Sequence, residues 1–192
     1  MVWLLCDYGE VLSLPQPDAD RRLIEQAAKS DGPRLWPDYW ANRPAYDRGD
    51  LTREQYWAAV LGYHPSSAQL ESLLSADISS WLHPNESCLA AALRASDRGL
   101  RLAVLSNAPV ELASAIDSQG WLSAFSPRIY SCMIRATKPE PAAYAAAVDL
   151  LGVTPSDIFF LDDRPANVSA AAEFGFRAAV FSGPAQIDSL LT

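Results

Sequence analysis

The sequence is poor in cysteine and lysine and has no long hydrophobic segment. Its three cysteines, Cys6, Cys88 and Cys132, are an odd number without a closely spaced pair, so neither a disulfide framework nor a zinc site is indicated. No apolar run approaches the roughly 18 residues of a membrane-spanning helix, and the apolar residues 1–6 are too few for a signal peptide before Asp7. We therefore expect a cytoplasmic protein without a membrane partner.

Positive charge is scarce as well. The chain has 15 Lys and Arg against 23 Asp and Glu, and its formal net charge of −8 is the wrong sign for electrostatic binding to nucleic acid. We therefore expect no nucleic-acid partner. Only Lys29 and Lys138 are lysines, so an anionic small molecule would have to be held by a local cation or by a few placed donors.

The residues that are present can build a sizeable core. The 192 residues are 49% hydrophobic and 20% charged, which excludes wholesale disorder, and the length fits one domain or one domain with an inserted lobe. Short apolar runs alternate with helical segments, a pattern typical of a parallel α/β sheet. Proline opens several of these helices and glycine follows their last turn. The predicted strands cover 2–6, 102–105, 128–131, 158–161 and 178–181.

Residues 14–84 contain no strand-like run. The spacing predicts helices over 20–30, 34–41, 56–61 and 66–74, and the insertion of about 70 residues is far longer than a crossover of roughly 10–12 residues. We predict an α/β core made of 1–13 and 85–192. The helical lobe, 14–84, should lie over the carboxyl ends of the strands, where open α/β sheets bind ligands.

Polar residues follow the predicted strands. Asp7 comes directly after the first strand, Ser106 and Asn107 after the second, and Lys138 shortly after the third. Each has a structural alternative: a turn aspartate, a helix N-cap and a solvated loop lysine. In a doubly wound sheet, however, the strand ends converge on one crevice, so the four side chains are expected to meet.

Asp162 and Asp163 follow the fourth strand and are harder to explain structurally. Two adjacent carboxylates at a strand end repel each other unless a cation or hydrogen-bond donors hold them. A hard divalent cation is a suitable partner, because such ions prefer oxygen ligands.

Taken in order, these motifs resemble the haloacid dehalogenase superfamily, specifically its hydrolases with a Rossmann-like core and a helical cap inserted after the first strand. The resemblance covers the whole chain, including the position of the insertion. The motifs are Asp7-Tyr8-Gly9-Glu10-Val11-Leu12, Leu105-Ser106-Asn107, Lys138-Pro139 and Leu161-Asp162-Asp163 with Asn167.

The resemblance implies a nucleophile and a metal site. Asp7 would attack phosphorus and form an aspartyl-phosphate that water hydrolyses. Mg²⁺ would be held by Asp7, the main-chain carbonyl of Gly9 and Asp163, with Asp162 behind them or sharing the metal.

The resemblance also implies a phosphate site. The Ser106 hydroxyl, the Asn107 amide and the Lys138 ammonium would hold the phosphoryl oxygens, and Lys138 would keep Asp7 ionised. In the inserted lobe, Arg43 and Arg48 are candidates for substrate contact. The lobe's aromatic residues are expected to pack its interior; they are Trp36, Tyr39, Trp40, Tyr46, Tyr56 and Trp57.

Gly9 departs from the pattern of the phosphatases in this superfamily. They usually carry a second aspartate two residues after the nucleophile, and it protonates the leaving oxygen. A general acid contributes about 10²–10⁴ in rate. Glu10 is adjacent, but a one-residue offset in a bend should aim its side chain elsewhere. Members of one subgroup, related to sugar-phosphate phosphatases, have glycine at this position and are still regarded as phosphatases. Gly9 therefore affects the expected range of leaving groups more than the expected class of reaction.

The sequence therefore predicts a Mg²⁺-dependent phosphatase for a small phosphorylated metabolite such as a sugar phosphate, acting as a monomer or homodimer. A 2-haloacid dehalogenase would use an aspartate nucleophile without a metal, and the Asp162-Asp163 pair argues against it. A phosphosugar mutase usually relies on the aspartate that Gly9 replaces. A non-catalytic relative that binds a phosphorylated ligand or a partner protein is favoured only by Gly9.

Overall fold

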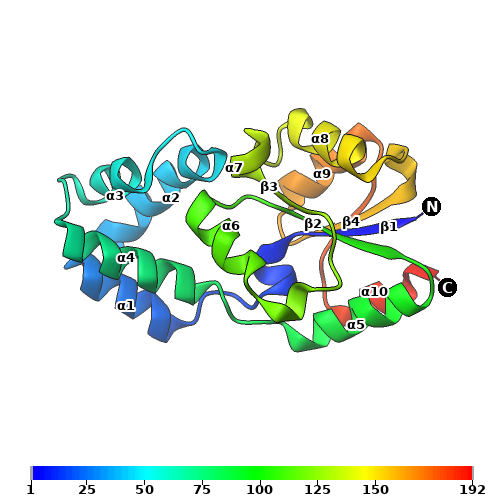
Figure 1. Ribbon diagram of the computed structural model, residues 1–192, viewed down its shortest axis with the longest axis horizontal. Coiled ribbons are helices and arrows are strands. Elements are labelled where there is room, and N and C mark those ends of the chain that lie inside the picture. Colours follow the sequence, from blue (N-terminus) through cyan, green and yellow to red (C-terminus); the bar gives the residue numbers. More distant parts are fainter. Residues whose placement is uncertain (1, 192) are drawn as a thin grey trace.

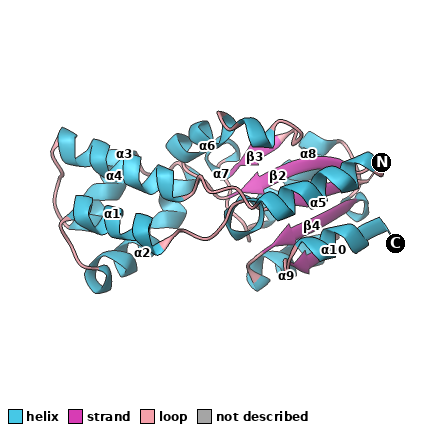
Figure 2. Ribbon diagram, turned by 90° about the horizontal axis from the view of Figure 1, so that it is seen from below, coloured by secondary structure: helices cyan, strands magenta, loops and turns pink. Residues whose placement is uncertain are grey.

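A parallel sheet with helices on both faces forms one part of the molecule, and a group of helices forms the other (Figures 1 and 2). The structure is a computed structural model and describes residues 2–191. The two parts lie side by side along the long axis, and both termini lie at the far end of the sheet part (Figure 1).

Within the described residues the strands form one five-stranded parallel sheet in the order β3-β2-β1-β4-β5. The central strands are buried along almost their whole length, which explains why they appear in the sequence as continuous apolar runs. The predicted parallel α/β fold is confirmed. The strands are β1 (Trp3–Cys6), β2 (Arg101–Ser106), β3 (Arg128–Tyr130), β4 (Ile158–Asp162) and β5 (Arg177–Val180).

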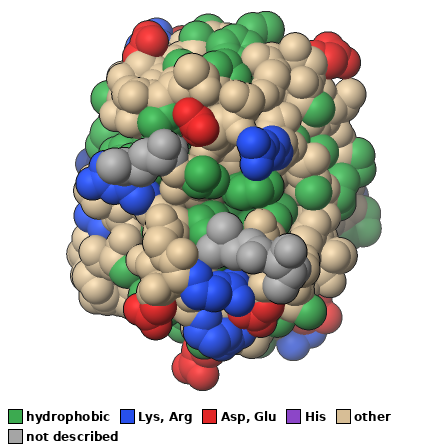
Figure 3. Space-filling view, turned by 90° about the vertical axis from the view of Figure 1, so that its right-hand side faces the viewer, with side chains coloured by type: hydrophobic (Ala, Val, Ile, Leu, Met, Phe, Trp, Pro, Cys, Tyr) green, Lys and Arg blue, Asp and Glu red, His purple; other side chains and the backbone are tan. Residues whose placement is uncertain are grey.

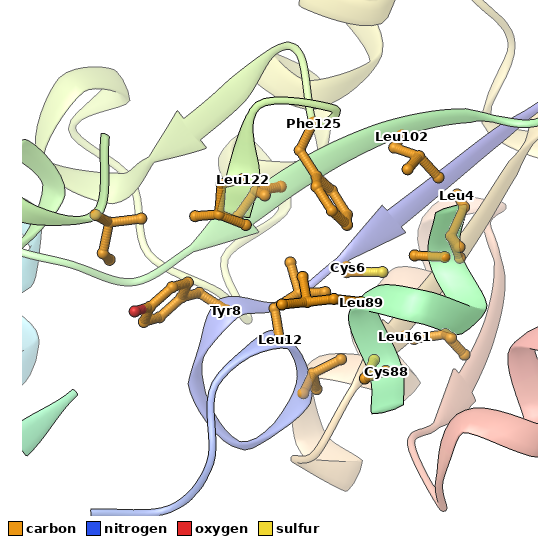
Figure 4. Close-up of a cluster of buried hydrophobic side chains, with 14 of the residues drawn as sticks. Leu4, Cys6, Tyr8, Leu12, Cys88, Leu89, Leu102, Leu122, Phe125 and Leu161 are labelled. Carbon is orange, nitrogen blue, oxygen red and sulfur yellow. The ribbon is translucent and has the colours of Figure 1, made fainter. Parts of the chain in front are cut away.

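Alternate residues of β1 serve different faces of the sheet, as the two-residue period of a strand requires. Leu4 and Cys6 pack in the cluster under α5, α6 and α10, which Figure 4 shows, whereas Trp3 and Leu5 pack in the cluster under α8 and α9. The helices of this part are α5 (Glu86–Asp97), α6 (Val110–Asp117), α7 (Ser131–Ile134), α8 (Pro141–Leu151), α9 (Pro165–Phe174) and α10 (Pro184–Asp188), with short 3₁₀ turns at Gly120–Leu122, Pro155–Asp157 and Ser189–Leu191.

The other part is helical and has its own buried cluster, which includes Tyr39, Tyr46, Tyr56 and Trp57, as predicted for the aromatic residues. Trp40, by contrast, is 40% exposed. The helices are α1 (Asp18–Ala28), α2 (Gly32–Arg48), α3 (Arg53–Leu61) and α4 (Ser67–Ser80).

Helix α2 is longer than the predicted segment 34–41 and passes through Pro37 and Pro44. Each proline removes one backbone hydrogen bond. The buried side chains recur every three or four residues along one face of α2, so packing against the rest of the helical part compensates for the missing bonds.

Two antiparallel chain segments connect the parts. Ser13 and Pro84 form an isolated bridge, and the amide of Leu14 donates to the carbonyl of His83 over 2.7 Å. His83 also contacts Asp20, with 2.6 Å between Nε2 and Oδ2. These segments lie at the predicted boundaries 13/14 and 84/85; the division into separate domains stays a prediction.

Other expectations concern the surface and the cysteines. Over the described residues no helix is long and apolar enough to span a membrane. All three cysteines are buried and free. The face opposite the helical part carries a few basic and acidic side chains among hydrophobic ones (Figure 3).

Candidate active site

The polar residues at the strand ends line one cavity of about 440 Å³ between the sheet and the helical part. Asp7 follows β1, Ser106 ends β2, and Asp163 follows β4. Lys138 enters from the loop before α8. The structure therefore brings together side chains that are far apart in the sequence, because the carboxyl ends of parallel strands meet at one edge.

Lys138 lies between two carboxylates. Its Nζ is 2.8 Å from Oδ1 of Asp7 and 2.7 Å from Oδ2 of Asp162. All three side chains are buried, and Asp162 has no exposed surface. Burial alone would lower the pKa of Lys138, but Asp7 and Asp162 outweigh it and raise that pKa above its ordinary value. The ammonium is therefore charged at neutral pH.

Both carboxylate oxygens of Asp162 accept hydrogen bonds from protein donors. Besides Lys138, the Asn167 amide donates to both oxygens over 2.9 and 3.0 Å, and the main-chain amide of Arg164 donates to Oδ1 over 2.9 Å. Asp162 is therefore built to hold Lys138 in place, which leaves its neighbour Asp163 facing the cavity.

Asp7 is held by its backbone and by two donors. Its amide donates to the carbonyl of Leu161 over 2.8 Å, and its Oδ1 accepts from the amide of Tyr8 over 2.7 Å as well as contacting Lys138. Burial raises the pKa of Asp7 to about 7, with Lys138 opposing that rise and Asp162 adding to it. A further cation next to Asp7 would favour its ionised form.

The carboxylates of Asp7, Asp162 and Asp163 fit a hard metal ion. Each offers an oxygen, and these oxygens lie within 4.8 Å of one another. Burial and the charge of Asp162 raise the pKa of Asp163, and the charges of Arg164 and Lys138 only partly oppose that rise, so a further cation would be favourable here. Because donors already fill Asp162, the arrangement favours Asp7 and Asp163 as direct ligands, and oxygen ligands suit Mg²⁺. Gly9 lines the same cavity.

Ser106 and Asn107 differ in how they are used. The Ser106 hydroxyl lines the cavity and has no hydrogen-bond partner within residues 2–191, so it is available to a ligand. The Asn107 side chain accepts from the amide of Lys138 and donates to the Lys138 carbonyl, both over 2.9 Å. Asn107 therefore positions the lysine; its contact with a phosphoryl group stays a prediction.

Arg43 and Arg48 of α2, the two candidates for substrate contact, are both engaged in ion pairs at the cavity wall. Arg43 is buried, with Nε 2.7 Å from Asp47 and Nη1 3.3 Å from Asp77. Arg48 pairs with Glu140 and contacts the Thr137 hydroxyl over 3.2 Å. Both line the cavity, so substrate contact stays a prediction for each, but their first role is to hold protein groups in place.

The turn after Asp7 differs from expectation at Glu10. Glu10 adopts the left-handed conformation with φ 58° and lines the cavity, whereas the sequence placed its side chain elsewhere. The left-handed residue redirects the chain immediately after Gly9, and the Glu10 charge contributes to raising the pKa of Asp163. Gly9 has φ −64° and ψ 133°, which any residue can adopt.

Asp47 and Trp81 are among the residues of the cavity wall that sequence reasoning missed. Asp47 is four residues after Arg43 on a helix, a spacing that signals an ion pair. Trp81 follows the last turn of α4 and gives no local signal, because its place in the cavity depends on how the two parts pack.

Comparisons with known proteins identify relatives. The family of haloacid dehalogenase-like hydrolases matches residues 38–175. The (S)-2-haloacid dehalogenase of Xanthobacter autotrophicus is 30% identical over 147 residues, 75% of this chain and 53% of that protein. The chloroplast flavin mononucleotide hydrolase 1 of Arabidopsis thaliana is 45% identical over 51 residues, 27% of this chain and 21% of that protein. The chain thus spans about half or less of the length of these curated relatives.

Solved structures share the fold. A HAD-family enzyme from Bacteroides thetaiotaomicron superposes with a TM-score of 0.78 at 17% identity, covering 95% of this chain and 94% of that one. Its complex with magnesium and inorganic phosphate has a TM-score of 0.76 at 19% identity, with 95% of both chains covered. The L-2-haloacid dehalogenase of Xanthobacter autotrophicus with covalently bound chloropropionic acid has a TM-score of 0.69 at 22% identity, covering 100% and 83%.

Proposed function

This chain belongs to the haloacid dehalogenase-like hydrolase family, and on that premise we propose that it is a Mg²⁺-dependent phosphatase for a small phosphorylated metabolite. One observation carries the proposal: oxygens of Asp7, Asp162 and Asp163 lie within 4.8 Å of one another, and the Lys138 ammonium contacts the first two. When ionised the three carboxylates carry three negative charges, of which the Lys138 ammonium in contact with two of them offsets one. One divalent cation would neutralise the excess.

Asp7 and Asp163 are the proposed direct ligands of the metal, and the family resemblance adds the main-chain carbonyl of Gly9. Bound there, Mg²⁺ would supply positive charge to the phosphoryl oxygens. Asp162 would remain behind the metal, because Lys138, Asn167 and the Arg164 amide already fill its oxygens.

Asp7 is the proposed nucleophile. Its carboxylate oxygen would form a bond to phosphorus while the bond from phosphorus to the leaving oxygen breaks, and that oxygen departs with the electron pair. Water would then attack the aspartyl-phosphate, which releases phosphate and regenerates Asp7. Lys138 supports this role, since its contact with Oδ1 favours the ionised carboxylate.

The phosphoryl group would be bound by Ser106 and Lys138. The Ser106 hydroxyl can donate to a phosphoryl oxygen, and the Lys138 ammonium would offset its charge. Asn107 would hold the lysine through the two bonds to its backbone and complete the site with its remaining N–H.

The proposed substrates are esters with good leaving groups, since no aspartate stands at position 9. Sugars phosphorylated at the anomeric carbon, acyl phosphates and aryl phosphates fit this requirement. The cavity of about 440 Å³ holds a small metabolite. Flavin mononucleotide is worth including in a screen because of the Arabidopsis relative.

Dehalogenation is the second candidate, because a relative that matches 75% of this chain is a haloacid dehalogenase. That reaction also begins with attack by an aspartate but needs no metal. The extra carboxyl group of Asp163 favours the phosphatase.

A substrate screen in two buffers tests the choice. The protein is assayed with a panel of phosphate esters and with 2-chloropropionate, each with Mg²⁺ and with excess EDTA. We expect phosphate release that requires Mg²⁺ and no chloride release. Chloride release that persists in EDTA would assign the chain to the dehalogenases, and no turnover of any compound would favour a non-catalytic relative.

A further inference from the structure

We propose that Trp81 keeps a carboxyl group from acting at position 9, because its indole lies in contact with the place of a Cβ there and leaves no room for the rest of an aspartate side chain. The inference rests on the proposed phosphatase activity. It concerns a residue from the end of the helical part that reaches the loop of the nucleophile, 72 positions away from Gly9 in the sequence.

The position of the ring relative to Gly9 is the first evidence. A Cβ added to Gly9 would lie 3.4 Å from Cζ3 and 4.0 Å from Cε3 of Trp81. A methyl group would thus already touch the ring, and the carboxyl group of an aspartate extends further. Since the backbone of Gly9 has an ordinary conformation, the neighbouring ring and not the main chain limits the size of residue 9.

The ring is held in place from several sides. The Tyr8 hydroxyl donates to the carbonyl of Trp81 over 2.8 Å, which fixes its backbone to the loop after β1. Trp40 packs with its edge against the indole at 6.4 Å between centroids, and the Arg43 guanidinium lies 6.0 Å from its ring. A close-packed ring of this kind does not move aside without cost.

The chemical consequence concerns the oxygen that departs. The residue two positions after Asp7 is Gly9, and the indole of Trp81 lies beside it. No carboxyl group can therefore deliver a proton from position 9. The bond between phosphorus and the leaving oxygen then breaks with the electron pair left on an unprotonated oxygen. Only leaving groups of low pKa depart readily under these conditions.

The test compares leaving groups in four variants. For each protein, log kcat/KM with Mg²⁺ is plotted against leaving-group pKa for a series of aryl and alkyl phosphates. The variants are Gly9→Asp, Trp81→Ala, Gly9→Asp with Trp81→Ala, and Gly9→Asp with Trp36→Ala. Trp36 is the matched control, a tryptophan of the same helical part that does not line the cavity.

We expect a steep slope for the wild type, for Trp81→Ala and for Gly9→Asp alone, since none of these has a carboxyl group at position 9 with room to act. The double variant with Trp81→Ala should have a flatter slope and gain about 10²-fold on alkyl phosphates relative to Gly9→Asp. The Trp36 control should keep the slope of Gly9→Asp. Equal slopes for Gly9→Asp with Trp81→Ala and for Gly9→Asp with Trp36→Ala would overturn the role of Trp81. A flat slope for the wild type would overturn it as well.

Thermal unfolding in EDTA gives a second readout that needs no turnover. Gly9→Asp should lower Tm, and Trp81→Ala or Trp81→Val should reduce that loss because either change frees the space beside residue 9. If Gly9→Asp lowered Tm by the same amount in the wild type and in the two Trp81 variants, the inference would be overturned. A protein that displays the expected coupling in Tm but hydrolyses no phosphate ester would instead overturn the proposed phosphatase function, and the leaving-group role with it.

Discussion

At the scale of single residues, the charge balance of the site depends on Lys138. Its ammonium is shared by Asp7 and Asp162, and the main-chain bonds of Asn107 fix where it enters the cavity. Asp162 holds the lysine, and the lysine favours ionised Asp7. Burial and Asp162 raise the pKa of Asp163 more than the charges of Arg164 and Lys138 lower it. Each of these roles predicts a different response to substitution.

Replacing Asp7 with asparagine tests the nucleophile. Asp7→Asn keeps the shape of the side chain but removes the attacking charge, so turnover should fall by about 10³ or more. The fold should survive, since an amide oxygen can still accept from the Tyr8 amide. Steady-state kinetics and circular dichroism check this; wild-type turnover would contradict the covalent mechanism.

Replacing Lys138 with methionine tests the charge balance. Lys138→Met leaves Asp7 and Asp162 buried without their cation, which should reduce the free energy of unfolding by about 3–5 kcal/mol and abolish turnover. Lys29→Met is the matched control because Lys29 is the other lysine and is exposed; its effect should stay within about 0.5 kcal/mol. Urea unfolding in EDTA measures both. Equal stabilities would show that the three buried groups are not coupled.

Replacing Asp163 with asparagine tests the metal site through its pH dependence. Folding raises the pKa of Asp163, so the native state binds its proton more tightly than the unfolded state and this group destabilises the metal-free protein as pH rises above its ordinary pKa. In EDTA at pH 7, Asp163→Asn should therefore raise Tm, by about 2–4 °C for each kcal/mol of relief.

With Mg²⁺ the wild type should have the higher Tm and Asp163→Asn the lower one. The wild type gains about 2.7 kcal/mol at a metal concentration 100 times Kd, while Asp163→Asn loses a ligand and gains less. Asp38→Asn, an exposed carboxylate of α2, is the control and should respond to Mg²⁺ like the wild type. A Tm of the Asp163 variant that rises with Mg²⁺ as much as the wild type's would exclude Asp163 as a ligand.

At the scale of elements, the C-terminal end of α2 is tied to the loop that carries Lys138. Arg48 contacts Thr137 and Glu140, the residues on either side of the Lys138-Pro139 pair. The Ser131 hydroxyl at the start of α7 donates to the carbonyl of Asp47 over 2.6 Å. The helical part therefore supports the position of the lysine from outside the sheet.

Removing this tie should affect catalysis more than stability. Arg48→Ala should lower kcat/KM by about 10- to 100-fold, because a displaced lysine loses its alignment with the phosphoryl group. The control is Arg53→Ala, which removes a surface ion pair with Glu54 at the start of α3. Kinetics with the best ester of the screen measure both variants. An Arg48 variant as active as the Arg53 variant would contradict the positioning role.

The elements also explain how far the sequence could be interpreted. The central strands were predictable because a strand buried on both faces is a continuous apolar run. The convergence of Asp7, Ser106 and Asp163 follows from parallel topology alone. Helix α2 was predicted too short, since Pro37 and Pro44 suggest breaks that tertiary packing overrides.

Features that depend on packing across the cavity could not be predicted. No pattern in the sequence relates Trp81 to Gly9, and the left-handed conformation of Glu10 is rare for a glutamate. The hydrogen-bond donors to Asp162 explain why two adjacent aspartates differ in their surroundings. One donor comes from helix α9, one from the loop of Lys138 and one from the main chain two residues on.

At the scale of the whole molecule, the site lies where two separately packed parts meet. The helical part has a hydrophobic cluster of its own, distinct from the two clusters on the faces of the sheet. Polar contacts join the parts on the side away from the connecting segments. They include Tyr46 with Glu111 over 2.8 Å, and Arg135 with Asp50 over 2.7 Å.

Because the parts have separate cores, we expect their cooperative unfolding to depend on these contacts. The wild type should unfold in one calorimetric transition with a total enthalpy of roughly 130 kcal/mol, equal to its van't Hoff enthalpy. The double variant Arg48→Ala with Arg135→Ala should unfold in two steps, since it removes the ion pairs that join α2 and the turn after it to the sheet part. Arg53→Ala with Arg94→Ala removes surface pairs within each part and should keep one transition. Two transitions in the wild type would mean that the two parts already unfold independently. One transition in the wild type and in both double variants would mean that the apolar contacts and the connecting segments alone couple the parts.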